Sequence, residues 1–299
     1  MQAGSVAEQR LPLCTVVIPT RHRPRLLRKC LESIAECDYP HDRLEVLVVD
    51  DGDSADGAAG VVSGRLEVGV LRTPGLGPAA ARNAASRRAS GTVLAFTDDD
   101  CRVDPGWLRA LCSRLEGAPR RAAGGHTTNS LRGNRWSAAS QRIIDLVYAY
   151  YNADPDHARF LTTNNLAMPT EAFRDVGGFD ESFRTAEDRD FCRRWLARGL
   201  EIAYAPEALV HHGHPMTRQA FLRQHFDYGR GAFRFHREAE QAHDGQLRAV
   251  LGFYGSMPRL LREVGDNGRV GVADVALWQA ANAAGFVWEA ARSVARRGE

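Results

Sequence analysis

The feature that most constrains this chain is a run of three carboxylates, Asp98 to Asp100, directly after a short apolar segment. That segment, 91–96, begins at a glycine and reads as a buried strand. Open α/β sheets bind their ligands at the carboxyl ends of strands. Adjacent carboxylates repel one another unless water or a cation lies among them, and hard divalent cations prefer oxygen ligands. The triplet therefore indicates either a metal-held phosphate site or a solvated acidic turn.

Strand and helix signals alternate four times within about 100 residues, which predicts a doubly wound α/β domain. The expected strands are 13–19, 44–49, 66–71 and 91–96, and the expected helices are 24–36 and 78–89. Further on, the pattern predicts helices at 105–115 and 187–198, and strands at 162–168 and 202–204. After Pro215 the composition favours helix throughout, with Gly229 and Gly231 expected to interrupt it.

Composition excludes several classes of protein. The 299 residues allow one large domain, or one domain with an appendage, and 44% hydrophobic content suffices for a core. A net charge of +2 is too small to imply nucleic acid as a partner. The amino terminus lacks a signal-peptide core, and no apolar run reaches the roughly 20 residues that span a bilayer. Six scattered cysteines without a C-x-x-C pair are typical of reduced thiols, so we expect a cytoplasmic protein.

Two further motifs fall on the same predicted sheet edge. Asp50 and Asp51 end the second strand, where an acid can accept hydrogen bonds from a ribose or form an Asx turn with Gly52. Residues 75–83 superficially match the dinucleotide fingerprint G-x-G-x-x-A. They follow the third strand rather than the first, however, and only the Asp triplet supplies an acid downstream. Arg82 in this segment would contact a diphosphate or lie on the surface.

Two motifs in the second half have competing interpretations. Glu187 and Asp188 follow Thr185 in the spacing of a capping box, and a carboxylate at a cleft edge could equally serve as a general base. His211, His212 and His214 could complete an oxygen-rich metal site or lie on the surface. Zinc is disfavoured because no cysteine has the spacing of a ligand.

Taken together, seven segments resemble the family 2 glycosyltransferases with the GT-A fold, in that family's order. They are 17–20, 48–52, 77–83, 96–100, 177–180, 187–188 and 205–212, and the resemblance covers about residues 13 to 214. It implies a Rossmann-like, doubly wound mixed sheet. The catalytic domain would be 1–214, with a nucleotide-sugar half at about 13–104 and an acceptor half at about 105–214. Residues 215–299 would form a helical carboxyl-terminal extension.

The resemblance also implies roles for individual residues. Thr20 and Asp51 would meet the nucleotide base and ribose, and Arg82, Asp98 and Asp99 would lie along the donor. Asp98 and Asp100 match the family's D-x-D pair, in which Asp100 would ligate the metal together with His212. Asp188 matches the catalytic base. Asn164, Asn165, Gly178 and Glu187 would form the wall near the transferred sugar and the acceptor.

The implied reaction is inverting, metal-dependent transfer of one sugar from a nucleotide-sugar to an acceptor hydroxyl. The cofactor would be Mn²⁺ or Mg²⁺ and the donor a UDP-sugar first, with GDP- and dTDP-sugars as alternatives. Gln224 is not followed by the Arg-Trp of processive synthases, so the non-processive type is expected. The alternative classes are a nucleotide-binding module without catalysis and an NAD-dependent oxidoreductase, the second resting only on the glycine fingerprint.

The partners remain partly open. The sequence identifies no acceptor, and self-association into a homodimer is one of the open alternatives for the helical extension. Residues 218–237 interleave aromatic residues with five arginines, which allows docking on the catalytic domain or contact with the inner face of a membrane. Docking is favoured, because apolar stripes of this kind more often pack against protein.

Overall fold

The computed structural model describes residues 11–52, 66–242, 246–264 and 271–295. Five stretches covered by the predictions therefore lie outside the described residues. They are the amino-terminal 1–10, on which the signal-peptide argument rests, 53–65 of the predicted catalytic domain, and 243–245, 265–270 and 296–299 of the predicted helical extension.

An eight-stranded mixed sheet runs through the molecule in the order β3-β2-β1-β4-β7-β6-β8-β5. The strands are β1 Cys14–Thr20, β2 Leu44–Asp50, β3 Val68–Arg72, β4 Val93–Phe96, β5 Cys101–Val103, β6 Arg121–Asn129, β7 Leu166–Pro169 and β8 Glu201–His212. Strands β1 to β4 are parallel, whereas β7 is antiparallel to both its neighbours and β5 is antiparallel to β8. The predicted doubly wound mixed sheet is confirmed.

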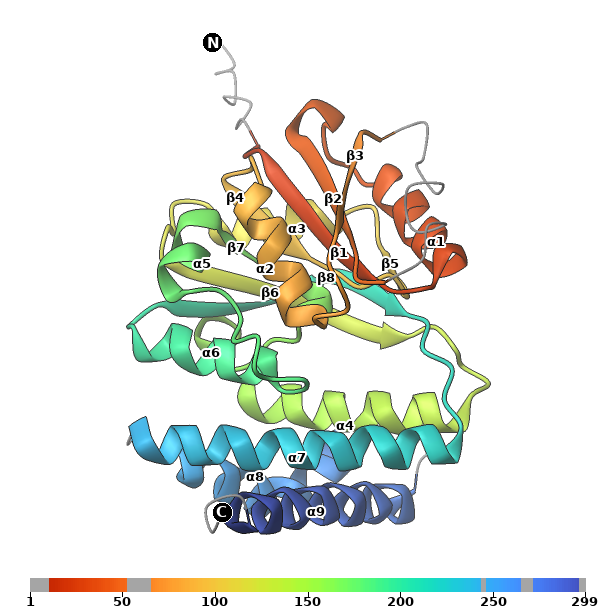
Figure 1. Ribbon diagram of the computed structural model, residues 1–299, viewed down its shortest axis with the longest axis vertical. Helices are drawn as coiled ribbons and strands as arrows, with labels where there is room; N and C mark the ends of the chain where they lie inside the picture. Colours follow the sequence, from red (N-terminus) through yellow and green to blue (C-terminus); the bar gives the residue numbers. More distant parts are fainter. Residues whose placement is uncertain (1–10, 53–65, 243–245, 265–270, 296–299) are drawn as a thin grey trace, which may run out of the picture.

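Nine helices are described, and they form two groups. The first six are α1 Pro24–Ala35, α2 Pro78–Arg88, α3 Trp107–Leu115, α4 Arg135–Tyr151, α5 Thr170–Val176 and α6 Glu187–Ala197. The last three are α7 Arg218–Ala242, α8 Gln246–Glu263 and α9 Val272–Ala295. In Figure 1, α4, α7 and α9 lie one beyond another below the sheet, with α8 beside them.

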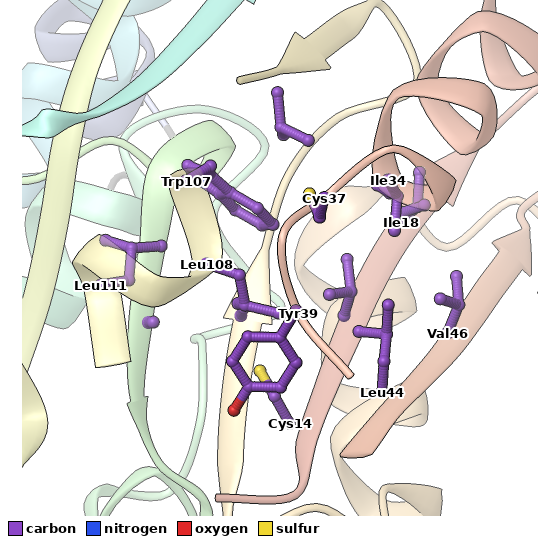
Figure 2. Close-up of a cluster of buried hydrophobic side chains, with 14 of the residues drawn as sticks. Cys14, Ile18, Ile34, Cys37, Tyr39, Leu44, Val46, Trp107, Leu108 and Leu111 are labelled. Carbon is purple, nitrogen blue, oxygen red and sulfur yellow. The ribbon is translucent and has the colours of Figure 1, made fainter. Parts of the chain in front are cut away.

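The two faces of the sheet carry separate cores. In β1, Cys14 and Ile18 face α1 and α3, and Figure 2 shows Ile18 beside Ile34 and Cys14 beside Tyr39. Val17 points to the other face, toward α2, α5 and α6. Because both faces are covered, the parallel strands are apolar along nearly their whole length. This explains why the sequence predicts β1, β2 and β4 closely.

A third core joins α4 to the carboxyl-terminal helices. It contains Ile143 and Leu146 of α4 together with Phe221 of α7, Phe253 of α8 and Trp278 of α9. Among the described helices, none is both long and apolar enough to cross a membrane. The predicted domain boundary at 214 stays a prediction, although α4 lies before it and packs with the helices after it.

The expected interruption of the helix at Gly229 and Gly231 is wrong. Helix α7 is continuous, and a Cβ at Gly229 would lie only 1.9 Å from the carbonyl oxygen of Asn282 in α9. Gly285 of α9 meets the carbonyl of Phe226 at the same distance. Gly229 and Gly285 let α7 and α9 approach closely. The prediction treated glycine only as a residue that interrupts helices and did not consider packing between helices. Strand β6 and helix α5 had no clear sequence signal, and the strand expected at 162–168 begins only at Leu166.

Candidate active site

A cleft of about 1080 Å³ opens at the carboxyl ends of β1, β2 and β4 and is closed below by the carboxyl-terminal helices. Of the residues singled out by the resemblance, ten line it: Thr20, Asp51, Arg82, Asp98, Asp99, Asp100, Asn164, Glu187, Asp188 and His212. Side chains that are distant in sequence are thus brought together. Asn165 and Gly178 are absent from the described lining.

Asp99 is buried and held by two neighbours. It accepts a hydrogen bond from the Thr20 hydroxyl at 2.7 Å, and the Arg23 guanidinium lies 3.3 Å away. Burial raises the pKa of Asp99 to about 6, and the negative charge of Asp100 adds to this, while Thr20 and Arg23 oppose it. Arg23 also pairs with Asp100 at 3.2 Å, so it supplies a positive charge among the clustered acids.

Two histidines, one at the end of β8 and one just after it, lie beside the Asp100 carboxylate. His212 Nε2 lies 3.2 Å from Oδ1, and His214 Nδ1 lies 3.5 Å from Oδ2. Burial alone would raise the pKa of Asp100, but hydrogen bonds from both histidines hold it well below its usual range. Burial lowers the pKa of His212, and the stronger effect of Asp100 raises it. The carboxylate is therefore anionic.

Potential metal ligands are grouped around this carboxylate. Atoms of Asp100, Cys101 and His212 lie within 4.8 Å of one another. Burial and the nearby carboxylates raise the pKa of the Cys101 thiol well above its ordinary value, so it stays protonated and is a poor ligand. The remaining oxygen and imidazole donors fit Mn²⁺ or Mg²⁺ rather than a thiolate-bound metal.

Arg82, buried on α2, bridges two acids. Its Nη2 donates to Asp98 at 2.6 Å and its Nη1 to Glu187 at 3.2 Å. Burial and the charge of Glu187 raise the pKa of the neighbouring Asp188 to about 7, whereas the Arg189 amide and Arg82 lower it. Of the two adjacent acids, Glu187 is paired with an arginine, while Asp188 can exchange a proton near neutral pH.

The capping-box interpretation of Thr185 is wrong. The residue at the N-cap of α6 is Ala186, which has φ +69° and no side-chain capping bond. The Thr185 hydroxyl donates instead to the carbonyl of Asp227 in α7 at 3.1 Å. A non-glycine residue in this left-handed region costs about 1–2 kcal/mol, and such strain clusters at functional sites. The turn before Glu187 and Asp188 is therefore fixed by tertiary contacts rather than by a local cap.

The Asp51 carboxylate is hydrogen-bonded to the loop between β3 and α2. Its Oδ1 accepts hydrogen bonds from the Thr73 hydroxyl at 2.6 Å and the Leu76 amide at 2.9 Å, and its Oδ2 accepts from the Gly77 amide at 2.7 Å. The acid therefore holds the start of α2 at the rim of the cleft. Its contact with a ribose stays a prediction.

The resemblance implied that Asn165 and Gly178 line the cleft, but the structure places neither of them in the described lining. Asn165 is completely buried, where its amide accepts from Trp107 and donates to the carbonyls of His126 and Ala208. A Cβ at Gly178 would lie 2.6 Å from Asn83. Both residues hold the scaffold together. Asn164 does line the cleft and accepts hydrogen bonds from two threonine hydroxyls.

Arg23, Tyr228 and His225 are among the lining residues that were not assigned roles from the sequence. Arg23 had a usable signal, since it immediately precedes Pro24 at the edge where the acid triplet was expected. Tyr228 and His225 belong to α7, and no local pattern indicates that this helix closes the cleft. Their placement depends on helix packing and could not be read from the motifs.

The fold is similar to those of two solved structures. A mannosyltransferase from Pyrobaculum calidifontis, solved with GDP-Man and Mn²⁺, aligns with a TM-score of 0.62 and 19% identity, covering 97% of this chain and 82% of that one. Residues 1–349 of TarS from S. aureus align with a TM-score of 0.61 and 20% identity, covering 90% and 78%. At these identities the likeness concerns the fold.

Curated relatives are more similar in sequence. The pre-mycofactocin glycosyltransferase of Mycobacterium tuberculosis is 29% identical over 73% of this chain and 46% of its own length. An N-acetylglucosaminyltransferase of Mesorhizobium japonicum is 30% identical over 75% of this chain and 56% of its own length. This chain thus spans about half the length of these relatives. AglE of Haloferax volcanii is 26% identical over 74% of this chain and 73% of its own length.

The family model "Glycosyl transferase family 2" matches residues 15–177, more than half of the 299 residues. The match runs from β1 through the acid triplet to the turn after α5, and so includes the strand ends that build the cleft. This chain belongs to glycosyl transferase family 2.

Proposed function

We propose that this chain is an inverting, metal-dependent glycosyltransferase that moves one sugar from a nucleotide-sugar to a hydroxyl group of an acceptor. One observation carries the proposal. Two candidate cation ligands, Asp100 and His212, and a carboxylate with a pKa of about 7, Asp188, line the same cleft. Family membership supports the same reaction class.

The size of the cleft supports two substrates. Pockets that hold one small ligand are typically about 300–1,000 Å³. The observed 1080 Å³ leaves room for a nucleotide-sugar at the strand ends and an acceptor beyond it. One similar structure holds GDP-Man and another, of TarS, holds UDP, so a UDP-sugar remains the first expectation with GDP-sugars as the alternative.

The proposed roles follow from the environments of the side chains. Asp100 and His212 would hold Mn²⁺ or Mg²⁺, which as a Lewis acid supplies charge stabilisation for the diphosphate leaving group. Asp188 accepts the proton of the attacking acceptor hydroxyl, and base catalysis of this kind contributes about 10²–10⁴-fold. Glu187 is occupied by Arg82 and does not compete for that proton. Attack from the face opposite the leaving group inverts the anomeric centre.

The oxidoreductase alternative is disfavoured by a specific contact. A dinucleotide fingerprint binds pyrophosphate through the free amides of its glycine loop. Here Asp51 already accepts hydrogen bonds from the amides of Leu76 and Gly77. These two amides are therefore bonded to Asp51 rather than free to bind a pyrophosphate.

A thermal-shift panel of UDP-, GDP- and dTDP-sugars and NAD, each with and without Mn²⁺, tests the proposal. We expect one sugar nucleotide to stabilise the protein in a Mn²⁺-dependent manner and Asp100→Ala to remove that effect while remaining folded. Asp104→Ala is the matched control, because Asp104 bonds His211 at 2.8 Å outside the described cleft lining. Stabilisation by NAD alone, or undiminished turnover in Asp100→Ala, would contradict the metal-dependent transferase. Binding without turnover on any acceptor would favour a binding module.

A further inference from the structure

The cleft extends from Asp188 into a space between four helices, α4, α7, α8 and α9. We call this space the helical chamber; its wall includes Ile143, Val147, Phe235, Phe253, Trp278 and Phe286. Among the described residues that these helices contribute to the lining, Glu240 is the only acidic residue, and none is Lys or Arg. The wall that these helices contribute is therefore largely apolar, and the guanidinium groups of Arg189 and Arg193, which also line the cleft, lie 4.5 Å and 6.0 Å from the ring of Phe235.

Two polar side chains on the chamber wall are left without partners. His225 is 2% exposed, and neither of its ring nitrogens has a hydrogen-bond partner within the described chain. The buried Nε2 of Gln279 is likewise unpaired within that part of the chain. An unsatisfied buried polar group costs about 1–3 kcal/mol, so each needs an explanation. A ligand that brings its own polar group into the chamber supplies one.

The surroundings of His225 define what such a ligand would meet. Its ring lies 4.3 Å from that of Phe221, 5.6 Å from Tyr228 and 6.4 Å from Trp278. Burial lowers the pKa of His225 to about 4, so the imidazole is neutral and offers one donor and one acceptor. Aromatic faces beside a neutral donor and acceptor suit an uncharged ring compound with a hydroxyl or carbonyl group.

The chamber is connected to the proposed catalytic acids. Desolvation and the negative charges of Asp188 and Glu187 raise the pKa of Tyr228, one turn of α7 beyond Gln224. A Cβ at Gly231, also on α7, would lie 2.5 Å from the Thr185 hydroxyl in the turn before those acids. Helix α7 therefore packs against the turn that precedes Glu187 and Asp188, and it also forms one wall of the chamber.

We propose that the helical chamber binds the acceptor, and that this acceptor is an uncharged, mostly apolar ring compound whose inner polar group bonds His225 and Gln279. This assignment rests on the proposed function. A second hydroxyl of the acceptor faces Asp188. Its oxygen forms the new bond to the anomeric carbon, its proton passes to Asp188, and the bond to the diphosphate breaks with the electron pair leaving on the diphosphate.

The first test measures binding of 2-naphthol, a neutral aromatic alcohol, to the full chain by titration calorimetry. Ala283 and Ala284 are neighbours on α9 and both exposed, but only Ala283 belongs to the described chamber lining. Ala283→Trp should weaken 2-naphthol binding at least 10-fold, with the Mn²⁺-dependent thermal shift by the sugar nucleotide unchanged. Ala284→Trp should leave both unchanged. Equal effects of the two variants would overturn the assignment.

The second test concerns the polar pair. His225→Phe should weaken 2-naphthol about 3–10-fold, the value of one hydrogen bond, while leaving naphthalene binding unchanged. Its melting temperature should not fall, because the variant replaces an unpaired imidazole by an apolar ring. Equal loss for both probes would overturn the hydrogen-bonding role.

The two proposals can fail separately. If a sugar nucleotide stabilises the protein with Mn²⁺ but neither probe binds the wild type, the acceptor assignment is wrong and the proposed function stands. If the probes bind as expected but no sugar nucleotide does, the proposed function fails, and the chamber's assignment to an acceptor fails with it.

Discussion

At the scale of single residues, the environments of two adjacent acids separate their roles. Arg82 pairs with Glu187 at 3.2 Å. Burial and the neighbouring charge of Glu187 raise the pKa of Asp188 to about 7. A buried cleft carboxylate whose pKa is raised toward neutrality is a candidate for acid or base catalysis. The sequence alone shows only two consecutive acids, because the arginine that distinguishes them comes from 105 positions earlier.

Asp188→Asn should lower kcat by at least about 10²-fold, because the amide keeps the shape of the side chain but cannot accept the acceptor's proton. Donor affinity should change little. Initial rates at saturating donor and calorimetric donor binding test this. A variant with near wild-type kcat would exclude Asp188 as the base.

The raised pKa also predicts a pH dependence. Activity should rise with an apparent pKa of about 7 as Asp188 deprotonates. For stability, a folded pKa above the unfolded value of 3.8 means that this group's contribution is fully present below pH 3.8 and is lost as the pH rises through about 7. Asp188→Asn should therefore melt higher than the wild type at pH 8 and show little difference at pH 4. Equal differences at both pH values would show that folding does not raise the pKa of Asp188.

At the scale of elements, glycines decide how α7 and α9 pack. Gly229→Ala would place a methyl group against the backbone of Asn282, and overpacking of this kind costs about 1–3 kcal/mol. Gly255→Ala is the matched control, because a Cβ there meets nothing within 4 Å in the interior of α8. That change should stabilise by about 0.5–1 kcal/mol. Denaturant unfolding gives both free energies, and similar signs for the two would refute the packing role.

The elements also show which structural features could be predicted from local sequence patterns and which could not. Strands β1 and β2 are predicted well, because continuous apolar runs ended by polar residues are local signals. Strand β6 is rich in Ala and Gly and forms because β7 and β8 pair with it on either side. Asn164 and Asn165 match one motif, yet a tight turn directs one to the cleft and the other into the core. The motif specifies residue type, and the surrounding backbone specifies direction.

At the scale of the whole molecule, α7 directs its aromatic face inward. Phe221 and Phe235 are at most 1% exposed. Arg230 pairs with Glu289 of α9 at 2.8 Å, and Arg237 bonds Ser293 at 3.1 Å. The aromatic and arginine pattern of this segment is thus used for docking within the chain.

We therefore expect the purified full chain to stay at the bottom of a flotation gradient with anionic phosphatidylglycerol liposomes at physiological salt. Phe221 and Phe235, which would have to enter a lipid surface, are already buried within the chain. Neutral liposomes provide the control for trapping. Specific flotation with the anionic vesicles would mean that another surface of the molecule binds lipid.

The core that α4 shares with α7, α8 and α9 affects how such proteins can be recombined. Ile143 and Leu146 lie before residue 214, whereas Phe221, Phe253 and Trp278 lie after it, and all belong to one cluster. A chimera that exchanged only the residues after 214 between relatives would cut through this cluster and join two mismatched halves. A graft that carries residues 135–151 along with 216–295 would keep it whole.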